Sequence, residues 1–563
     1  MTSQTRLAVF AGALAAAAAL APTASAQEHK ELGRMWTYHN PPKEFWQEEY
    51  GFSPSDEWLE HVRLSMLRYA NFCSASFISP NGLIMTNHHC ARGNVQEVTP
   101  AGEDWLTDGF FATSHDQEVQ VPGLTVQQLI ATRDVTAAMN EGITADMDRS
   151  QTEERLEANK TRLLETAEGD APQFEHEVVD LYQGGNYQLY SYKVFDDVRL
   201  VAVPQMQIAK FGGDPDNFTY PRFSLDFAML RAWEDGEPAN TSAHYFEWRT
   251  EGPKDGELVF VPGNPGSTGR LKTVSQIEFL RDVEHPRILN IIRMRIANMQ
   301  QRMDEDPEAA KELRSEMLSL ENARKAYTGY LDGIKNEATV NVKREAERKI
   351  QEKIKADPAL DESYGNLWER MAAVQQAKRD AFEQRSQQAL DEALAEEKVL
   401  EKKIGEAFFA VYGYDIPPDA TMTPRIADGI VSGFPMNGTI APYFTSLYGL
   451  YARWTEFGGE DPFDLPQNWI DKRGELDLST GFNLVSTCDI IGGNSGSAMI
   501  DREARVVGLV FDGNIESLGN NFIFTDDVPR TVSVHPEIII LALREVYGAG
   551  KIADEIEGKS GGN

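Results

Sequence analysis

Apolar and polar positions follow different patterns in the middle of the chain and toward its two ends. Toward the ends, short apolar runs such as residues 77–78 and 83–85 are separated by turn sequences such as Asn81-Gly82, which predicts strands joined by hairpins. The apolar run at residues 506–511 predicts another strand. Residues 277–410 are instead rich in charged residues, Ala and Leu, with few helix breakers, which predicts an all-helical segment.

Aspartate followed by proline marks two helix starts in this segment, at residues 306–307 and 357–358, because Asp caps a helix and Pro fits its first position. The apolar spacing is not a sustained heptad, which argues against the alternative of a coiled-coil dimerisation arm. The chain thus divides into an N-terminal part (27–276), a helical segment (277–410) and a C-terminal part (411–563). Other expected elements are helices within 28–70, a helix at 148–168, strands at 187–192 and 198–203, and a helix from His535 onward.

Residues 1–26 have the features of a secretory signal peptide. Arg6 supplies the positive start, residues 7–20 the apolar core, and Ala24-Ser25-Ala26 the small-residue cleavage site. The apolar stretch is short for a membrane span, and the A-x-A ending favours cleavage over an uncleaved anchor. We therefore expect a protein secreted across the inner membrane, in a bacterial periplasm, with no membrane insertion.

The net charge of −34 argues against a nucleic-acid partner, because a phosphate backbone requires a basic face. With 41% hydrophobic and 25% charged residues, the composition is that of a globular protein. We attribute the acidity itself to an acidic proteome rather than to a site that repels acidic groups.

The sequence G-N-S-G-S at residues 493–497 places a serine between small, flexible positions. A serine nucleophile on a tight turn needs this arrangement, and the N–H groups of Gly493 and Ser495 would then form an oxyanion hole. The alternative is a glycine-rich turn of a β-hairpin. A partner histidine and acid elsewhere in the chain must decide between a catalytic serine and such a turn.

A histidine follows the second strand of the expected hairpin, in T-N-H-H-C at residues 86–90, where we expect a small loop. Neighbouring strand residues point to opposite faces, so at most one of His88 and His89 would face a given site. They are poor shared metal ligands, and no second metal-binding motif accompanies them. Asp226 is the candidate acid, because it lies in an apolar, strand-like run where an unpaired carboxylate is costly.

Together these blocks resemble serine peptidase family 46, the bacterial dipeptidyl peptidases. The resemblance rests on T-N-H-H-C, on F-G-G-D-x-D-N at 211–217 with an aspartate nine residues later, on G-G-N-S-G-S at 492–497 and on F-D-G-N at 511–514. It implies a chymotrypsin-like double β-barrel with an inserted all-helical cap domain, and a catalytic triad of His89, Asp226 and Ser495. It also implies a homodimer, oligopeptide substrates, and no cofactor or metal.

The resemblance further implies residues that bind the substrate's free α-amine: Asp512, Asn217, the aromatic Phe218 and, by a weaker match, Asn322. Gly513 would lie in the S1 pocket, which holds P1, the second residue of the substrate. Relatives that cleave after acidic residues carry arginine there, so glycine predicts a hydrophobic P1, as in the dipeptidyl-peptidase 7 branch. The helical segment is shorter than is usual in the family.

The chain has three cysteines, and Cys73 and Cys90 flank the expected hairpin, so a disulfide could hold the histidine segment. The resemblance supports this pair, which leaves Cys488 as a buried free thiol. Three alternative functions stay open. They are a trypsin-like endopeptidase with Asp512 as the anchor for basic side chains, a dipeptidyl peptidase for acidic P1 residues, and a non-catalytic binding protein, against which the complete triad argues.

Overall fold

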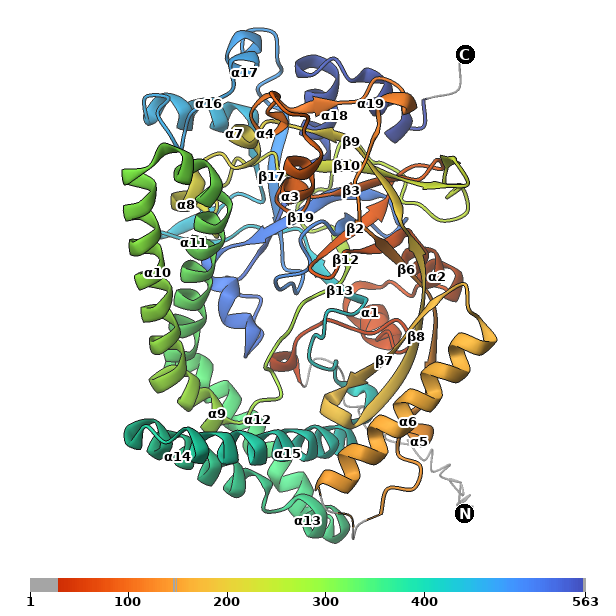
Figure 1. The fold of residues 1–563 in the computed structure, drawn as a ribbon, viewed down its shortest axis with the longest axis vertical. Coiled ribbons are helices and arrows are strands. Elements are labelled where there is room, and N and C mark those ends of the chain that lie inside the picture. The colour runs from red at the N-terminus through yellow and green to blue at the C-terminus, as the bar shows by residue number, and fades with distance from the viewer. Residues whose placement is uncertain (1–28, 145–146, 148, 560–563) are drawn as a thin grey trace, which may run out of the picture.

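Two antiparallel β-sheets and a helical domain make up the protein (Figure 1), as a computed structural model describes it for residues 29–144, 147 and 149–559. The expected signal peptide lies outside these residues. The expected mixture of β-sheets with an inserted all-helical domain is confirmed. No helix among the described residues is long and apolar enough to cross a membrane.

The first sheet carries the histidine segment. Its strand order is β4-β9-β10-β3-β2-β1-β6-β8-β7, with β5 beside β9 and β11 beside β10. The strands are β1 (Met66–Tyr69), β2 (Cys73–Phe77), β3 (Leu83–Thr86), β4 (Phe110–Phe111), β5 (Val119–Gln120), β6 (Val126–Asp134), β7 (Glu175–Leu181), β8 (Asn186–Phe195), β9 (Asp197–Val203), β10 (Ala228–Glu234) and β11 (Glu237–Pro238). The hairpin expected at Asn81-Gly82 joins β2 to β3, where Gly82 has a positive φ of 71° that glycine tolerates.

The second sheet carries the G-N-S-G-S turn, and its strand order is β13-β12-β18-β19-β20-β17-β16. The strands are β12 (Leu258–Gly263), β13 (Arg425–Ile430), β16 (Phe444–Ser446), β17 (Gly481–Ser486), β18 (Ala498–Ile500), β19 (Val506–Gly513) and β20 (Thr531–Val534), with a separate hairpin of β14 (Phe434–Met436) and β15 (Thr439–Ala441). The helical domain joins β12 to β13, which are neighbouring antiparallel strands. An insertion at this point leaves the sheet unbroken.

Seven α-helices and one π-helical turn form the helical domain, whose long helices stand along one side of the molecule and cross below it in Figure 1. They are α9 (Val274–Phe279), η4 (Leu280–Glu284), α10 (His285–Glu305), α11 (Pro307–Lys335), α12 (Glu337–Ala356), α13 (Pro358–Tyr364), α14 (Leu367–Gln384) and α15 (Gln387–Tyr412). Both expected Asp-Pro starts begin helices, α11 and α13. The Asp357 carboxylate accepts a hydrogen bond from Ala359 N, as an N-cap does.

Shorter elements complete the chain. They are η1 (Lys30–Leu32), α1 (Lys43–Tyr50), α2 (Asp56–Ser65), α3 (His88–Val98), α4 (Trp105–Asp108), η2 (His115–Gln117), α5 (Thr136–Met139), α6 (Arg149–Asp170), η3 (Tyr182–Gly184), α7 (Met206–Ala209), α8 (Gly213–Asp216), η5 (Gly413–Asp415), α16 (Leu447–Glu456), α17 (Gln467–Lys472), η6 (Ile515–Asn521), α18 (Pro536–Leu541), η7 (Ala542–Val546) and α19 (Gly550–Ile556).

Three local expectations were wrong. T-N-H-H-C leads into helix α3 at His88, not into a loop. Asp226 lies two residues before β10 rather than inside a strand. The expected C-terminal helix is interrupted near Gly548, whose φ is 63°.

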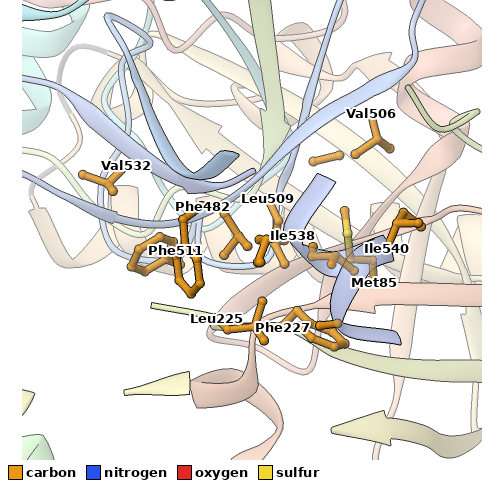
Figure 2. Packing of buried hydrophobic residues seen from close by; sticks show 14 of the residues in the cluster. Met85, Leu225, Phe227, Phe482, Val506, Leu509, Phe511, Val532, Ile538 and Ile540 are labelled. Atoms are coloured by element: carbon orange, nitrogen blue, oxygen red, sulfur yellow. The ribbon is translucent and has the colours of Figure 1, made fainter. Parts of the chain in front are cut away.

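A shared hydrophobic core holds the two sheets together (Figure 2). Met85 and Phe227 come from the first sheet and its approach, Leu509 and Val532 from the second, and Ile538 from α18. Each of these side chains is fully buried, which stabilises the fold by about 1.5–3 kcal/mol per large side chain. The core thereby fixes the histidine segment relative to the serine turn.

Candidate active site

One cavity of about 440 Å³ lies between the two sheets and the helical domain. The residues predicted for the site that line it are His89, Asn217, Phe218, Asp226, Asn322, Ser495, Asp512 and Gly513. Gly493 is not in the lining, but its neighbour Gly492 is. Folding therefore brings together residues from the N-terminal part, the helical domain and the C-terminal part of the chain.

His89 and Asp226 form a pair joined by two hydrogen bonds. The imidazole Nδ1 lies 2.6 Å from Asp226 Oδ2, and the backbone N–H of His89 donates to Oδ1 at 3.0 Å. Burial by itself lowers the pKa of His89, but the Asp226 carboxylate outweighs burial and the pKa is raised. Burial likewise raises the pKa of Asp226, but the charge and hydrogen bond of His89 outweigh it and the pKa is lowered. Both directions stabilise the charged pair.

Strand register explains why this pair forms. Thr86, at the end of β3, is paired with Ala228 at the start of β10, so the residues after Thr86 lie beside those before Ala228. Asn87 Nδ2 donates to the backbone carbonyl of Asp226 at 2.8 Å. Helix α3 begins at His88, and the N–H groups of its first turn have no partner within the helix. The Asp226 carboxylate supplies one, which is a favourable place for a negative charge.

His88 lines the same cavity, so the expectation that only one of the two histidines would face it was wrong. Its side chain is buried, and burial lowers its pKa to about 4, so the ring is neutral near pH 7. Its Nε2 has no hydrogen-bond partner among the described residues, whereas His89 is held by Asp226.

We call residues 492–496, which carry the predicted nucleophile Ser495, the nucleophile turn. Its backbone carbonyls accept hydrogen bonds from surrounding segments. Gly492 O accepts from Gly266 N at 2.7 Å, and Ser495 O accepts from Ser74 N at 2.8 Å. In the described part of the chain, the N–H groups of Gly493 and Ser495 donate to no other residue. Two free, neighbouring N–H groups are what an oxyanion hole requires. The described contacts include no hydrogen bond from the Ser495 hydroxyl to His89; such contacts are often long before substrate binds.

The residues predicted to bind the amine contact one another in another part of the lining, which we call the Asp512 end. Asn217 Nδ2 donates to Asn322 Oδ1 at 3.0 Å, which joins the body of the protein to helix α11. Asp512 Oδ2 accepts from Phe218 N at 3.0 Å, and Oδ1 accepts from Gly513 N at 2.9 Å. Burial raises the pKa of Asp512, against the lowering effect of neighbouring positive charge and these N–H groups.

Sequence reasoning missed two basic residues at this end. Arg222 is buried, and its Nη1 donates to Asp512 Oδ2 at 2.8 Å; an arginine in the apolar stretch Tyr-Pro-Arg-Phe was its signal. Lys325 Nζ donates to the backbone carbonyls of Asp214, Pro215 (3.2 Å) and Asn217 (2.7 Å). Lys325 lies one turn after Asn322 on α11, and this spacing was the available signal.

Apolar side chains line the cavity near Gly513, beside the hydroxyl of Ser517. A Cβ on Gly513 would lie 2.3 Å from Ser517 Oγ, and the next residue, Leu518, lines the cavity. Ala326 and Tyr330, one turn apart on α11, line it too, and α11 packs closely on η6. Of the described lysines and arginines in the lining, Arg92 lies on α3 and Lys210 after α7, whereas Arg222 lies beside Gly513 but is paired with Asp512.

A disulfide joins Cys73 to Cys90, and Cys488 is a buried free thiol, as expected. The bridge connects the start of β2 with helix α3 directly after His89. Burial raises the pKa of Cys488 to about 12, so this thiol is neutral and unreactive near pH 7.

The chain is similar to known proteins over most of its length. The family model for peptidase S46 matches residues 30–397 and 380–558. The Asp/Glu-specific dipeptidyl-peptidase of Shewanella putrefaciens is 25% identical, with 86% of this chain and 91% of the relative covered. Dipeptidyl-peptidase 7 of Capnocytophaga gingivalis is 22% identical, with 88% and 91% covered. Both alignments run over more positions than this chain has residues, so the relatives contain segments that it lacks.

The fold is also found among solved structures. The crystal structure of Porphyromonas endodontalis DPP11 in complex with the dipeptide Arg-Asp matches with a TM-score of 0.78 and 18% identity. The match covers 93% of this chain and 99% of that one, so nearly the whole architecture is shared. The family model, which spans almost the entire described chain, establishes that the protein is a peptidase of the S46 family.

Proposed function

We propose that the protein is a serine dipeptidyl peptidase that releases dipeptides from the free N-terminus of oligopeptides. The observation that carries this proposal is that one cavity is lined both by the His89–Asp226 pair with Ser495 and by Asn217, Asn322 and Asp512. Relatives that align over most of the chain are named dipeptidyl peptidases.

In the proposed reaction, His89 Nε2 takes the proton of the Ser495 hydroxyl as Ser495 Oγ attacks the scissile carbonyl. Asp226 keeps the Nδ1 proton of His89 in place and stabilises the imidazolium. The N–H groups of Gly493 and Ser495 receive the negative oxygen. His89 then gives its proton to the leaving amine, and water hydrolyses the acyl-enzyme by the same steps.

The Asp512 end of the cavity would hold the substrate's ammonium group. Asn217 uses its NH₂ group on Asn322, so its Oδ1 is left to accept. The Asp512 carboxylate is held by backbone N–H groups and Arg222, and it balances the ammonium charge. Phe218 gives this end an aromatic wall. With the amine fixed there, the second peptide bond reaches Ser495.

We further propose that P1 is hydrophobic. The named relatives include both Asp/Glu-specific enzymes and dipeptidyl-peptidase 7, at similar sequence identity. Sequence identity therefore does not distinguish an acidic from a hydrophobic P1 preference. The lining near Gly513 does favour one, because Ala326, Tyr330 and Leu518 offer apolar surface and the nearby Arg222 is already paired with Asp512. An acidic P1 side chain would lose its hydration without gaining a partner.

The test is kcat/KM on fluorogenic dipeptide substrates ending in Met, Phe or Leu against those ending in Asp or Glu, each with a free and an acetylated amine. We expect acetylation to lower kcat/KM about 100-fold, since it removes the charge-assisted hydrogen bonds. Ser495→Ala should be inactive. Equal cleavage of acetylated substrates would identify an endopeptidase, and faster cleavage after Asp or Glu would overturn the P1 preference.

A second variant tests the S1 wall itself. Gly513→Arg alone would collide with Ser517, so the change is made together with Ser517→Ala. The double variant should gain activity on acidic P1 residues relative to Ser517→Ala alone, because a guanidinium pairs with a carboxylate. No gain would place P1 selection elsewhere in the cavity.

We also propose a periplasmic location and a homodimer. The Cys73–Cys90 bridge supports an oxidising compartment. The dimer rests on the family resemblance, and light scattering on the purified mature chain tests it: a monomer mass at micromolar concentration would overturn it.

A further inference from the structure

The hydroxyl of Ser74 lies between two backbone segments at the nucleophile turn. Ser74 is fully buried in β2, and its Oγ donates to the carbonyl of Gly493 at 2.8 Å. The backbone N–H of Asn264 donates to the same Oγ at 2.8 Å. Because Asn264 N can only donate, the single hydroxyl hydrogen of Ser74 is directed to Gly493.

The Gly493 carbonyl lies between the two N–H groups that would form the oxyanion hole. Gly493 has a φ of 105°, and a Cβ there would lie 2.5 Å from Asn264 O, so glycine is required. Glycine's wide backbone freedom means that the orientation of the peptide unit between Gly493 and Asn494 depends on outside contacts. In the described part of the chain two contacts hold this peptide unit: the Ser74 hydroxyl donates to its carbonyl, and its Asn494 N–H donates to Ile491 O at 3.0 Å.

Ser74 holds the turn at a second point as well. Its backbone N–H donates to Ser495 O at 2.8 Å, so one residue fixes the carbonyls on both sides of Asn494. Gly496 packs directly on it, because a Cβ there would lie 2.0 Å from Ser74 O. The backbone contact would survive any substitution of the Ser74 side chain, whereas the hydroxyl contact would not.

We propose that Ser74 is a positioning residue of the reaction, whose hydroxyl fixes the Gly493 peptide so that the N–H groups of Gly493 and Ser495 stay directed at the oxyanion. This rests on the proposed role of these N–H groups. Without the hydroxyl, this peptide unit keeps, among the described residues, only the hydrogen bond from Asn494 N to Ile491 O at 3.0 Å, and its carbonyl can tilt toward the site, where its negative end would oppose the developing charge. The effect falls on the transition state, since the oxyanion forms only there.

Ser76 provides a matched control. It lies two residues along the same strand and therefore on the same face, and it is also fully buried. Its hydroxyl has no hydrogen-bond partner among the described residues. Ser74→Ala and Ser76→Ala thus remove the same atom from equally buried positions, and the two variants differ in whether that atom holds the turn.

The experiment measures kcat and KM of both variants in the full mature chain, on whichever dipeptide substrate the wild type cleaves fastest. We expect Ser74→Ala to lower kcat about 10- to 100-fold with KM within about twofold, and Ser76→Ala to leave both unchanged. The rate of Ser495 labelling by a fluorophosphonate, which needs no amine recognition, should fall in parallel for Ser74→Ala only. Wild-type kcat in Ser74→Ala, or an equal loss in Ser76→Ala, would overturn the proposal.

A second pair of variants covers the case in which Ser74→Ala does not fold. Ser74→Thr keeps a hydroxyl and Ser74→Val replaces it by a methyl group at nearly equal volume. A kcat at least about tenfold higher for Thr than for Val supports the role of the hydroxyl, and equal values refute it. A different result would contradict the proposed function itself: activity that survives Ser495→Ala, or activity that does not change when the substrate's amine is acetylated.

Discussion

Asp226→Asn is the change for which the structure makes the most specific prediction. Both carboxylate oxygens of Asp226 accept hydrogen bonds from His89, one from Nδ1 at 2.6 Å and one from the backbone N–H at 3.0 Å. Asparagine has one oxygen and one NH₂ group. The backbone N–H cannot change its role, so the oxygen will face it and the NH₂ group will face Nδ1.

That arrangement forces His89 into the tautomer with its hydrogen on Nε2. In this form the ring cannot accept the Ser495 proton, although every heavy atom keeps its place. The same substitution in a Ser-His-Asp triad lowers kcat about 10⁴-fold, equivalent to about 5 kcal/mol of transition-state stabilisation. We expect a loss of this size here, with KM little changed.

The pH dependence of kcat/KM tests the same pair independently, through the direction in which the pKa of His89 moves. In the wild type, Asp226 raises the pKa of His89, so the acid limb of kcat/KM should lie above the usual histidine value of about 6.5. In Asp226→Asn, burial and the charge of Arg92 still lower the pKa of His89 against a smaller raising effect of Asp512, so the residual activity should have its limb at lower pH.

The free energy of unfolding should also depend on pH through the His89–Asp226 pair. The Asp226 contribution is present above its unfolded pKa of about 4 and is lost as pH falls through its lower folded value. The His89 contribution is present below its unfolded pKa of about 6.5 and is lost as pH rises through its higher folded value.

The assay is kcat/KM from about pH 4 to 10 on a free-amine substrate, with urea unfolding to show that both proteins are folded. Asp214→Asn is the control, because Asp214 lines the same cavity but pairs with Arg324 instead of His89. A variant Asp226→Asn that keeps more than a tenth of wild-type kcat, or whose limb moves to higher pH, would refute the reasoning.

Two further predictions concern the helical domain and the disulfide. Lys325→Met removes the donor to the carbonyls of loop residues 214, 215 and 217, beside the proposed amine site. KM for free-amine substrates should therefore rise about tenfold, with a smaller change in kcat. Arg324→Gln, which loses a partly exposed ion pair to the same loop, should change KM less; equal effects would contradict this. Replacing Cys73 and Cys90 by Ala should lower the free energy of unfolding by about 3 kcal/mol, from the loop entropy of a bridge spanning 17 residues. Urea unfolding measures this loss, and mass spectrometry of unreduced wild-type protein should find Cys488 free.

Features that depend on neighbouring residues could be predicted from the sequence. The Asp-Pro helix starts, the hairpin at Asn81-Gly82 and the helical character of the middle segment all follow from short-range backbone preferences. Motif blocks likewise identified the family, because catalytic chemistry demands particular residues at close spacing. Prediction failed where local preference was ambiguous, as at His88, where an apolar strand passes directly into a helix that tertiary contacts stabilise.

Only the tertiary structure decided which distant residues share the cavity. Asn217 and Asn322 are 105 positions apart, Phe218 and Asp512 are 294 apart, and Ser74 lies far along the chain from the turn that it holds. No local pattern encodes such contacts, because they depend on how two sheets and a helical domain pack around one core. Arg222, Lys325 and Ser74 are ordinary residues in their own segments. They acquire partners at the site because packing buries their polar groups beside it, where leaving those groups unpaired would be costly.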